Sequence, residues 1–296
     1  MRIKLDLYRV FCEVAKSRSF SKAAAALYMT QPAVSQSIMQ LERELAIRLF
    51  TRMPTGVVLT NEGQLLYEYI SSAMNLISNG ENKLEEIKNL MMGELRIGVG
   101  DTTSRHYLLP YLERFHRLHS DVKLKIFNGT TIELCAMLKS GEIDFAICNL
   151  PIEDTALEII KCMEVHDIFV CGEMYKDMIS MPLSLEDLTG FPLIFLEAKS
   201  NSRQYVERYM LSKGVVIKPE IELGSHDLLL EFAKINLGIS CVIKEFSQEY
   251  LKNRILSEIT MTEKIPERNI GICFLKSIPL SPASSKFITT LELGYT

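Results

Sequence analysis

The residues of this sequence that could do chemistry lie first on one short segment, residues 31–45. Its apolar residues recur at spacings of four, three and four, as on the inward side of a helix; they are Val34, Ile38, Leu41 and Leu45. The outward side carries mostly amides and hydroxyls, and its residues are Gln31, Pro32, Ser35, Gln36, Met39, Gln40 and Arg43. Acids occur only toward the end of the segment. Short polar side chains hydrogen-bond base edges and phosphates in the DNA major groove. The segment predicts a DNA-reading helix, with a plain helical bundle as the alternative.

Two preceding segments would hold such a helix in place. Residues 5–17 repeat apolar side chains at helical spacing and predict a first helix. Ser21 is expected to cap a second helix over residues 23–27. Thr30 is expected to cap the third, with Pro32 in its first turn, where a missing N–H costs little.

The letters LFTRMPTGVVLTNEG follow the third segment. They predict a small hairpin, or wing, around a Pro-Thr-Gly turn. Arg48 and Arg52 stand at its base, where arginines meet phosphates beside the groove.

Charge and cysteine content bound the class of protein. Residues 1–60 hold nine Lys/Arg and four Asp/Glu, whereas the remaining 236 residues hold 24 and 33. A basic head on an acidic body favours a head that binds a polyanion. The seven cysteines include no CxxC pair and indicate reduced core thiols. With no spanning apolar run and no signal peptide, we expect a cytoplasmic protein with no membrane association.

Motifs for catalysis, nucleotides and metals are weak. The sequence contains no GxSxG and no HExxH. GVGDTTSR lacks the third glycine of a dinucleotide loop, and the five histidines show no repeated ligand spacing. We therefore expect no enzyme, no cofactor and no metal site.

After residue 93 short apolar strands alternate with helical patterns, which predicts an α/β body. At this point a family resemblance is clear. The stretch FSKAAAALYMTQPAVSQSIMQLERELAIRLFTR, followed by LTNEG, resembles the winged helix-turn-helix of the LysR-type transcriptional regulators. GELRIGV, YLLPYLERF and LKSGEIDFAI are similar to the effector-binding domain of that family.

The resemblance implies a fold and a function. The fold is an N-terminal winged helix-turn-helix, a long linker helix and a periplasmic-binding-protein-like α/β body of two subdomains. The function is regulated binding of double-stranded promoter DNA by a homodimer or homotetramer with a small-molecule effector. The DNA contacts expected from the residues and the resemblance together are Ser21, Lys22, Thr30, Gln31, Pro32, Ser35, Gln36, Gln40, Arg43, Arg48 and Arg52.

The expected domains follow from these patterns. They are a DNA-binding domain at 1–60, a linker and dimerisation helix at 61–92, and an effector-binding domain at 93–296. In the last, subdomain I is placed at about 93–165 and 269–296, and subdomain II at about 166–268.

The linker helix carries an apolar seam at alternating four and three spacing, which is typical of a coiled-coil contact. Gly80 after Asn79 interrupts it and could bend it. The seam residues expected at the subunit contact are Leu66, Ile70, Ala73, Ile77, Leu84 and Ile87. Packing of this helix within its own subunit is the alternative.

Hydroxyl residues at predicted helix starts indicate a site for a small anion. Thr102, Thr103 and Ser104 follow a strand and open a helix, where N–H groups favour negative charge. Asp101 in the same loop argues against an anion unless it turns away. The other cleft candidates, for which ordinary helix capping is the alternative, are Thr130 and Thr131 at a helix start, Asn149 and Leu150 at the first crossover, and Ser200, Ser202, Arg203 and His226 at two further helix starts.

Other functions stay open at this stage. One is a cytosolic solute-binding protein with an incidental helical head. Another is a redox-sensing regulator that uses Cys162 and Cys171, the pair closest in sequence. The alternative interpretation is that both are ordinary buried cysteines on strands.

Overall fold

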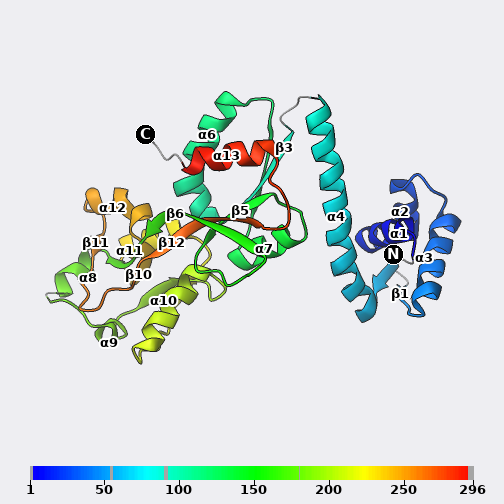
Figure 1. Ribbon diagram of the computed structural model, residues 1–296. Helices are drawn as coiled ribbons and strands as arrows, with labels where there is room; N and C mark the ends of the chain where they lie inside the picture. The colour runs from blue at the N-terminus through cyan, green and yellow to red at the C-terminus, as the bar shows by residue number, and fades with distance from the viewer. Residues whose placement is uncertain (1–2, 54–55, 90–92, 180, 293–296) are drawn as a thin grey trace. The chain divides into compact units, whose positions relative to one another are not determined.

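The computed structural model describes residues 3–53, 56–89, 93–179 and 181–292 (Figure 1). These residues divide into an N-terminal unit, which reaches Lys88 and also includes Lys139–Glu142, and a body, which comprises the other residues from Asn89 onward. In the described residues no helix combines the length and the apolar character that crossing a membrane requires. The expected linker residues 90–92 lie outside the described part of the chain.

The N-terminal unit consists of short helices, a hairpin and one long helix: α1 (Leu5–Ser17), α2 (Phe20–Ala26), α3 (Gln31–Leu45), β1 (Phe50–Met53), β2 (Gly56–Leu59) and α4 (Asn61–Asn89). Its core is made by the inward stripes of α1 and α3, including Phe11, Val14, Val34 and Leu41, all fully buried. α4 continues as one helix through Asn79 and Gly80, the step at which the sequence allowed for a bend.

The helix starts agree with the sequence prediction at one position and differ at another. Thr30 caps α3, because its Oγ1 accepts a hydrogen bond from the N–H of Ala33 at 3.4 Å. The cap of α2 is Ser19 and not Ser21, since the Ser19 hydroxyl accepts from Lys22 N at 3.4 Å. Phe20 is already helical and packs its ring 6.2 Å from Phe50, which starts the helix before Ser21.

The wing is tied to the helices by main-chain contacts. The N–H of Val57 donates to the carbonyl of Arg18, the left-handed residue that ends α1. Gly56 has φ +139°, and a side chain there would meet Arg18 O at 2.6 Å, so only glycine fits. The carboxylate of Glu42 on α3 accepts from the N–H of Leu49 at 2.7 Å. The wing and α3 therefore form one rigid surface.

The body contains two sheets of mixed strand direction (Figure 1). The first has the strand order β4-β3-β5-β12-β6, with β3, β4 and β5 parallel and β12 antiparallel to both neighbours. Its elements are β3 (Glu94–Val99), α5 (Asp101–Thr103), a short π-helical turn η1 (Ser104–Leu108), α6 (Leu109–Leu118), β4 (Lys123–Asn128), α7 (Thr131–Lys139), β5 (Phe145–Asn149), β6 (Leu157–Val165), β12 (Arg268–Leu275) and α13 (Pro282–Glu292).

The second sheet has the order β11-β7-β10-β8-β9, with β10, β8 and β9 parallel and β7 antiparallel to β10. Its elements are β7 (Asp167–Cys171), α8 (Glu173–Met178), α9 (Leu185–Leu188), β8 (Leu193–Leu196), α10 (Asn201–Ser212), β9 (Ile221–Leu223), α11 (His226–Lys234), β10 (Ile239–Ile243), η2 (Glu245–Ser247), α12 (Gln248–Lys252) and β11 (Ser257–Glu258).

Each sheet has its own aromatic core. In the first, α6 and α13 lie side by side and pack Phe115 against Phe287 with centroids 4.9 Å apart (Figure 1). In the second, Phe169 and Phe195 are buried with centroids 6.3 Å apart. The alternation of elements predicted the α/β class because several strands, such as β3, β8 and β10, are short apolar runs next to helices in the sequence.

The chain passes from the first sheet to the second at His166 and returns before Arg268. The expectation that Asn149 and Leu150 mark the first crossover is wrong. Asn149 ends β5, and the chain continues into β6 of the same sheet before it crosses.

A buried ion pair joins the two crossing strands. Arg268 at the start of β12 donates to both carboxylate oxygens of Asp167 at the start of β7, at 2.6 and 2.8 Å. The same guanidinium donates to Asn149 Oδ1 at 2.7 Å and to Ser202 Oγ at 3.1 Å. Both charged residues are buried, and their polar atoms are paired as buried charges require.

Replacing Arg268 by alanine should leave the Asp167 carboxylate buried without its charged partner. We expect the free energy of unfolding to fall by roughly 3–5 kcal/mol, as for other buried pairs that lose one partner. The measurement is urea unfolding of the full chain. The control is Lys244→Ala, which breaks an exposed pair with Glu258 and should cost less than about 1 kcal/mol. Equal losses of unfolding free energy in both variants would contradict the stabilising role of the buried Arg268 pair.

Candidate functional site

The outward face of α3 is exposed as the sequence predicted. Gln31, Pro32, Gln36, Gln40 and Arg43 are exposed, and Ser35 is half-buried. Gln40 donates to Glu44 at 2.8 Å, whereas Glu42 is turned to the wing. The face is therefore rich in amides, and its nearest acids are already engaged.

The remaining DNA candidates lie around this face. Ser21, Lys22 and Arg48 are exposed, and Thr30 is the α3 cap. The side chain of Arg52 lies outside the described residues.

The exposed apolar side chains of α4 are only partly those predicted. Leu66 packs against the N-terminal core, and Ile70 is half-buried. The exposed large residues on this helix include Leu65, Tyr69, Ile77 and Leu84. Ala73 is exposed as well, and the side chain of Ile87 lies outside the described residues. The sequence contains Leu65 and Leu66 side by side, and periodicity alone could not tell which of them faces its own domain.

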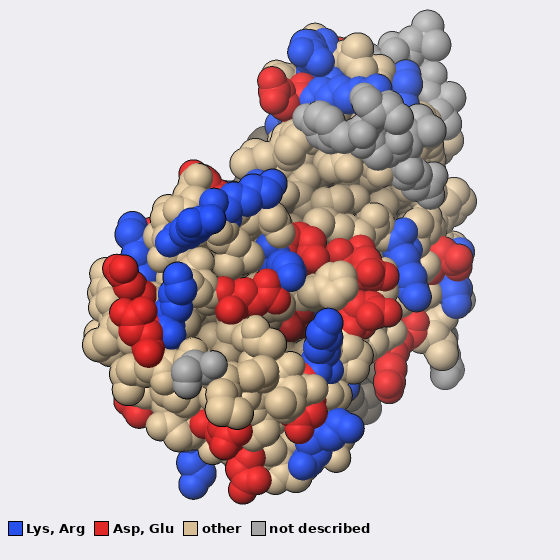
Figure 2. Space-filling view, turned by 90° about the vertical axis from the view of Figure 1, so that its left-hand side faces the viewer, with Lys and Arg blue, Asp and Glu red and all other residues tan. Residues whose placement is uncertain are grey.

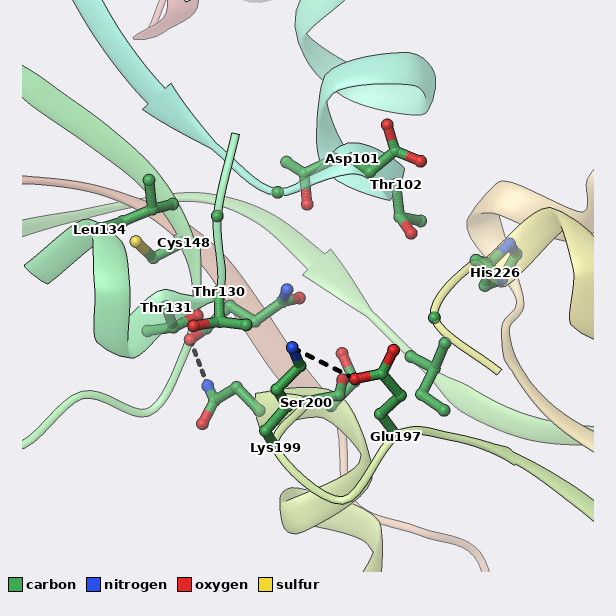
Figure 3. A pocket seen from close by; sticks show the side chains of 18 of the residues that line it. Asp101, Thr102, Thr130, Thr131, Leu134, Cys148, Glu197, Lys199, Ser200 and His226 are labelled. Atoms are coloured by element: carbon green, nitrogen blue, oxygen red, sulfur yellow. Dashed lines mark hydrogen bonds and ion pairs between the residues drawn. The ribbon is translucent and has the colours of Figure 1, made fainter. Parts of the chain in front are cut away.

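A pocket of about 320 Å³ lies between the two sheets of the body. Figure 3 shows Asp101, Thr102, Thr130 and Thr131 on one side and Glu197, Lys199, Ser200 and His226 on the other. The first group comes from loops after β3 and β4, and the second from the starts of α10 and α11. Ligands of open α/β sheets bind at such carboxyl ends of parallel strands.

Most of the predicted effector residues line this pocket. They are Asp101, Thr102, Thr103, Thr130, Thr131, Asn149, Ser200, Ser202 and His226. Apart from Asn149, which was chosen as a crossover residue, each lies at or just before the start of a helix that follows a strand, and this pattern is visible in the sequence.

Three predicted residues do not line it. Ser104 is part of η1, where its N–H donates to the carbonyl of Gly100. Leu150 is buried in the apolar cluster beneath α7. Arg203 is buried and bound to Glu207 at 2.8 Å and to Glu222 at 2.9 Å. The expectation of a cleft guanidinium at Arg203 is therefore wrong, because acids on α10 and β9 hold it away from the pocket.

Several pocket residues were missed by the sequence reasoning. Lys199 on the rim is 3.3 Å from Glu197, and both side chains are partly exposed. Glu133 also lines the pocket, and its carboxylate accepts from the N–H of Thr130 at 2.7 Å and from its hydroxyl at 2.9 Å. These bonds lower the pKa of Glu133 below its usual value, so it is charged at neutral pH. A charged residue in or beside a predicted helix does not by itself indicate a pocket, so the sequence reasoning did not select these residues.

The support beneath the pocket was missed as well. Arg268 binds two lining residues, Asn149 and Ser202, from below. It lies more than sixty positions from either in the sequence, so no local pattern could reveal the contact.

His226 is among the most deeply buried polar residues of the lining, at 2% exposed. The N–H of Ile243 donates to its Nε2 at 3.1 Å, so the proton of the neutral ring sits on Nδ1. Nδ1 has no hydrogen-bond partner within the described residues. Burial, followed by the nearby His106, lowers the pKa of His226 to about 4, so the ring is neutral at pH 7.

A neighbouring cluster joins the two halves of the body beside the pocket. Asp227 accepts from His106 Nε2 at 3.1 Å and pairs with Arg105 at 2.6 Å. Ligand atoms of His106, His226 and Asp227 lie within 4.8 Å of one another, a spacing that could hold a metal. Asp227 is engaged by Arg105 and His106, whereas His226 Nδ1 makes no hydrogen bond to any described residue.

Geometry does not support the redox alternative. Cys162 on β6 packs against the first core, whereas Cys171 at the end of β7 belongs to the second. Burial raises the pKa of Cys171 to about 11, which disfavours the reactive thiolate.

The body also offers no continuous basic surface on the face seen in Figure 2, where acidic and basic side chains are interspersed. A polyanion needs a field of one sign. This face agrees with the excess of acids beyond residue 60.

The depressed pKa of His226 predicts a pH dependence of stability. The unfolded histidine binds its proton near pH 6.5 and the folded one near 4, so the unfolded state binds more protons between these values. The free energy of unfolding should fall as the pH drops through that window, by about 2 kcal/mol between roughly pH 7 and pH 5. In urea unfolding, the His226→Gln variant should not show this decrease of unfolding free energy at low pH. The control variant His116→Gln, changed at an exposed histidine, should show the same decrease as the parent protein. The same pH dependence in both variants would contradict a neutral buried His226.

Comparison with known proteins places the chain in a family. Residues 5–64 match the family model "Bacterial regulatory helix-turn-helix protein, lysR family", and residues 88–293 match "LysR substrate binding domain". The RuBisCO operon transcriptional regulator of Allochromatium vinosum is 27% identical over 97% of this chain and 95% of its own. The regulator CysL of Bacillus subtilis (strain 168) is 23% identical over 98% and 97%.

Solved structures share the fold. Full-length CbnR complexed with its target DNA superposes with a TM-score of 0.68 at 16% identity, covering 99% of this chain and 100% of that one. A full-length OxyR variant from Pseudomonas aeruginosa has a TM-score of 0.69 at 19% identity, covering 99% and 94%. With both family models matched across the described units, the chain belongs to the LysR family of transcriptional regulators.

Proposed function

We propose that this protein is a sequence-specific transcriptional regulator that binds promoter DNA through α3 and the wing under the control of a small molecule in the pocket. The exposed amide face of α3 on a rigid three-helix core is the observation that carries the proposal. Gln36 and its neighbours would read base edges in the major groove. Arg43, Arg48 and Arg52 would contact phosphates beside it.

The working form in this proposal is a homodimer, assembled further into a homotetramer. The exposed apolar residues of α4, with Tyr69 at 71% and Leu84 at 68%, support a contact with a second copy. Such side chains on a long helix are stabilised by a facing helix of the partner. The protein would act in the cytoplasm, where promoter DNA is present.

Control would come from the pocket between the sheets. A ligand that contacts both walls favours one relative position of the two halves of the body, and thereby one packing of the subunits on DNA. The pocket would bind and not convert its ligand. The hydroxyl of Ser202 accepts from the Arg268 guanidinium, which cannot serve as the base of a nucleophilic serine.

Substitutions on the DNA face should separate base reading from phosphate contact. Gln36→Ala should weaken binding at the specific site and relax base preference. Arg48→Ala should weaken binding to all sequences alike and reduce the salt slope by about one unit. Fluorescence anisotropy over a salt series measures both, with Arg9→Ala on the exposed side of α1 as the control. Parental behaviour of both variants would show that another surface binds DNA.

A charge in the α4 contact should dissociate the subunits. Ile77→Glu buries a carboxylate in an apolar interface, which the assembly tolerates poorly. Sedimentation should show a smaller species with reduced DNA affinity. Ser78→Glu places the same charge on the adjacent exposed position and should leave the oligomer intact. An oligomer that survives Ile77→Glu would assign dimerisation to another surface.

A further inference from the structure

The floor of the pocket is a set of hydrogen-bond donors. Arg268 donates to Asn149 Oδ1 and to Ser202 Oγ. With those oxygens occupied, the amide N–H groups of Asn149 and the hydroxyl proton of Ser202 are left to donate. Because Arg268 is fixed by Asp167, it orients both donors and takes no direct part in the lining.

His226 adds a donor of the same kind. Its Nε2 accepts from Ile243, so Nδ1 carries the proton and has no partner within the described residues. Ser200 at the start of the twelve-residue α10 makes no side-chain cap, which leaves first-turn N–H groups at the same end of the pocket. An unpaired buried donor costs free energy until an acceptor arrives. The floor therefore suits the oxygens of an acid.

The rim of the pocket, in contrast to the floor, carries mainly negatively charged side chains. Asp101 and Glu133 are exposed at the mouth and Glu197 is partly exposed, and among the described lining residues the only lysine or arginine beside them is Lys199. Lys199 is already within 3.3 Å of Glu197. Among the residues that the structure describes, the one hydrogen bond to the Asp101 carboxylate is a long 3.3 Å contact from the Asn128 amide, so this carboxylate is open to a cation. A purely anionic ligand would meet net negative charge here.

We propose that the effector is a small zwitterion, an amino acid or similar amino carboxylate. Its carboxylate lies on the floor donors Asn149, Ser202 and His226, and its ammonium group lies at the rim near Asp101. The inference rests on the proposed effector function of this pocket and replaces the expectation of a purely anionic ligand. A volume of about 320 Å³ is at the small end of ligand pockets and suits a molecule of this size.

The test is binding of the twenty standard amino acids to the full chain, by thermal shift and then calorimetry. Each hit is compared with its N-acetyl derivative, which lacks the ammonium, and with its amide, which lacks the carboxylate. We expect at least one amino acid to raise the melting temperature. Each derivative should bind about ten- to a hundredfold more weakly, the worth of a lost hydrogen bond to a charged group.

Variants assign the two ends of the ligand. Asp101→Asn should lower the affinity for the amino acid about tenfold or more and leave the affinity for its N-acetyl derivative unchanged. Asp121→Asn removes an exposed carboxylate outside the pocket and should change neither. The unliganded melting temperature of each variant verifies that it is folded.

Three results would overturn the proposal: no amino acid binds, N-acetyl derivatives bind as well as their parents, or Asp101→Asn leaves the affinity unchanged. Binding of ammonium-free acids that is lost in Thr103→Val would overturn only the zwitterion and leave the effector pocket standing. Failure of the regulator function itself would appear separately, as an absence of specific DNA binding.

Discussion

The buried pair of Arg268 and Asp167 is the interaction on which the body depends. It lies where the chain passes between the sheets, and one guanidinium satisfies acceptors from β7, β5 and α10 together. A charge so far from water is stable only when its partners are in place. The arrangement therefore ties the two sheets together at the crossing strands and orients two residues of the pocket, Asn149 and Ser202, at the same time.

The DNA-binding unit was predictable to a large extent because its signals are local. The 4-3-4 spacing of Val34, Ile38, Leu41 and Leu45 and the Thr30 cap are both read within a few residues. The error at Ser21 has a cause that is not local. Both Ser19 and Ser21 are good caps, and the choice was made by packing of Phe20 on Phe50, a contact thirty residues away.

The pocket was predictable only as a set of loop positions. Residues after strands and before helices gather at one edge of a parallel sheet, so Thr102, Thr130 and Ser200 could be placed there from sequence. The direction of a charged side chain is set by distant partners. Arg203 on α10 is held by Glu222 on β9, and Arg268, which no motif singled out, bonds two residues of the pocket lining. Long-range pairing of charges is therefore the part of this site that the sequence did not disclose.

The exposed apolar face of α4 has a consequence for how the protein responds to its own abundance. In the proposed dimer, Leu65, Tyr69 and Leu84 leave water only when a second subunit is present, so folding stability and assembly are coupled by mass action. Dilution would lower the fraction of paired DNA-binding units before it affects any contact within α3. Promoter occupancy would then rise more steeply than in proportion to subunit concentration, and the amount of protein would set the range over which a small molecule can act.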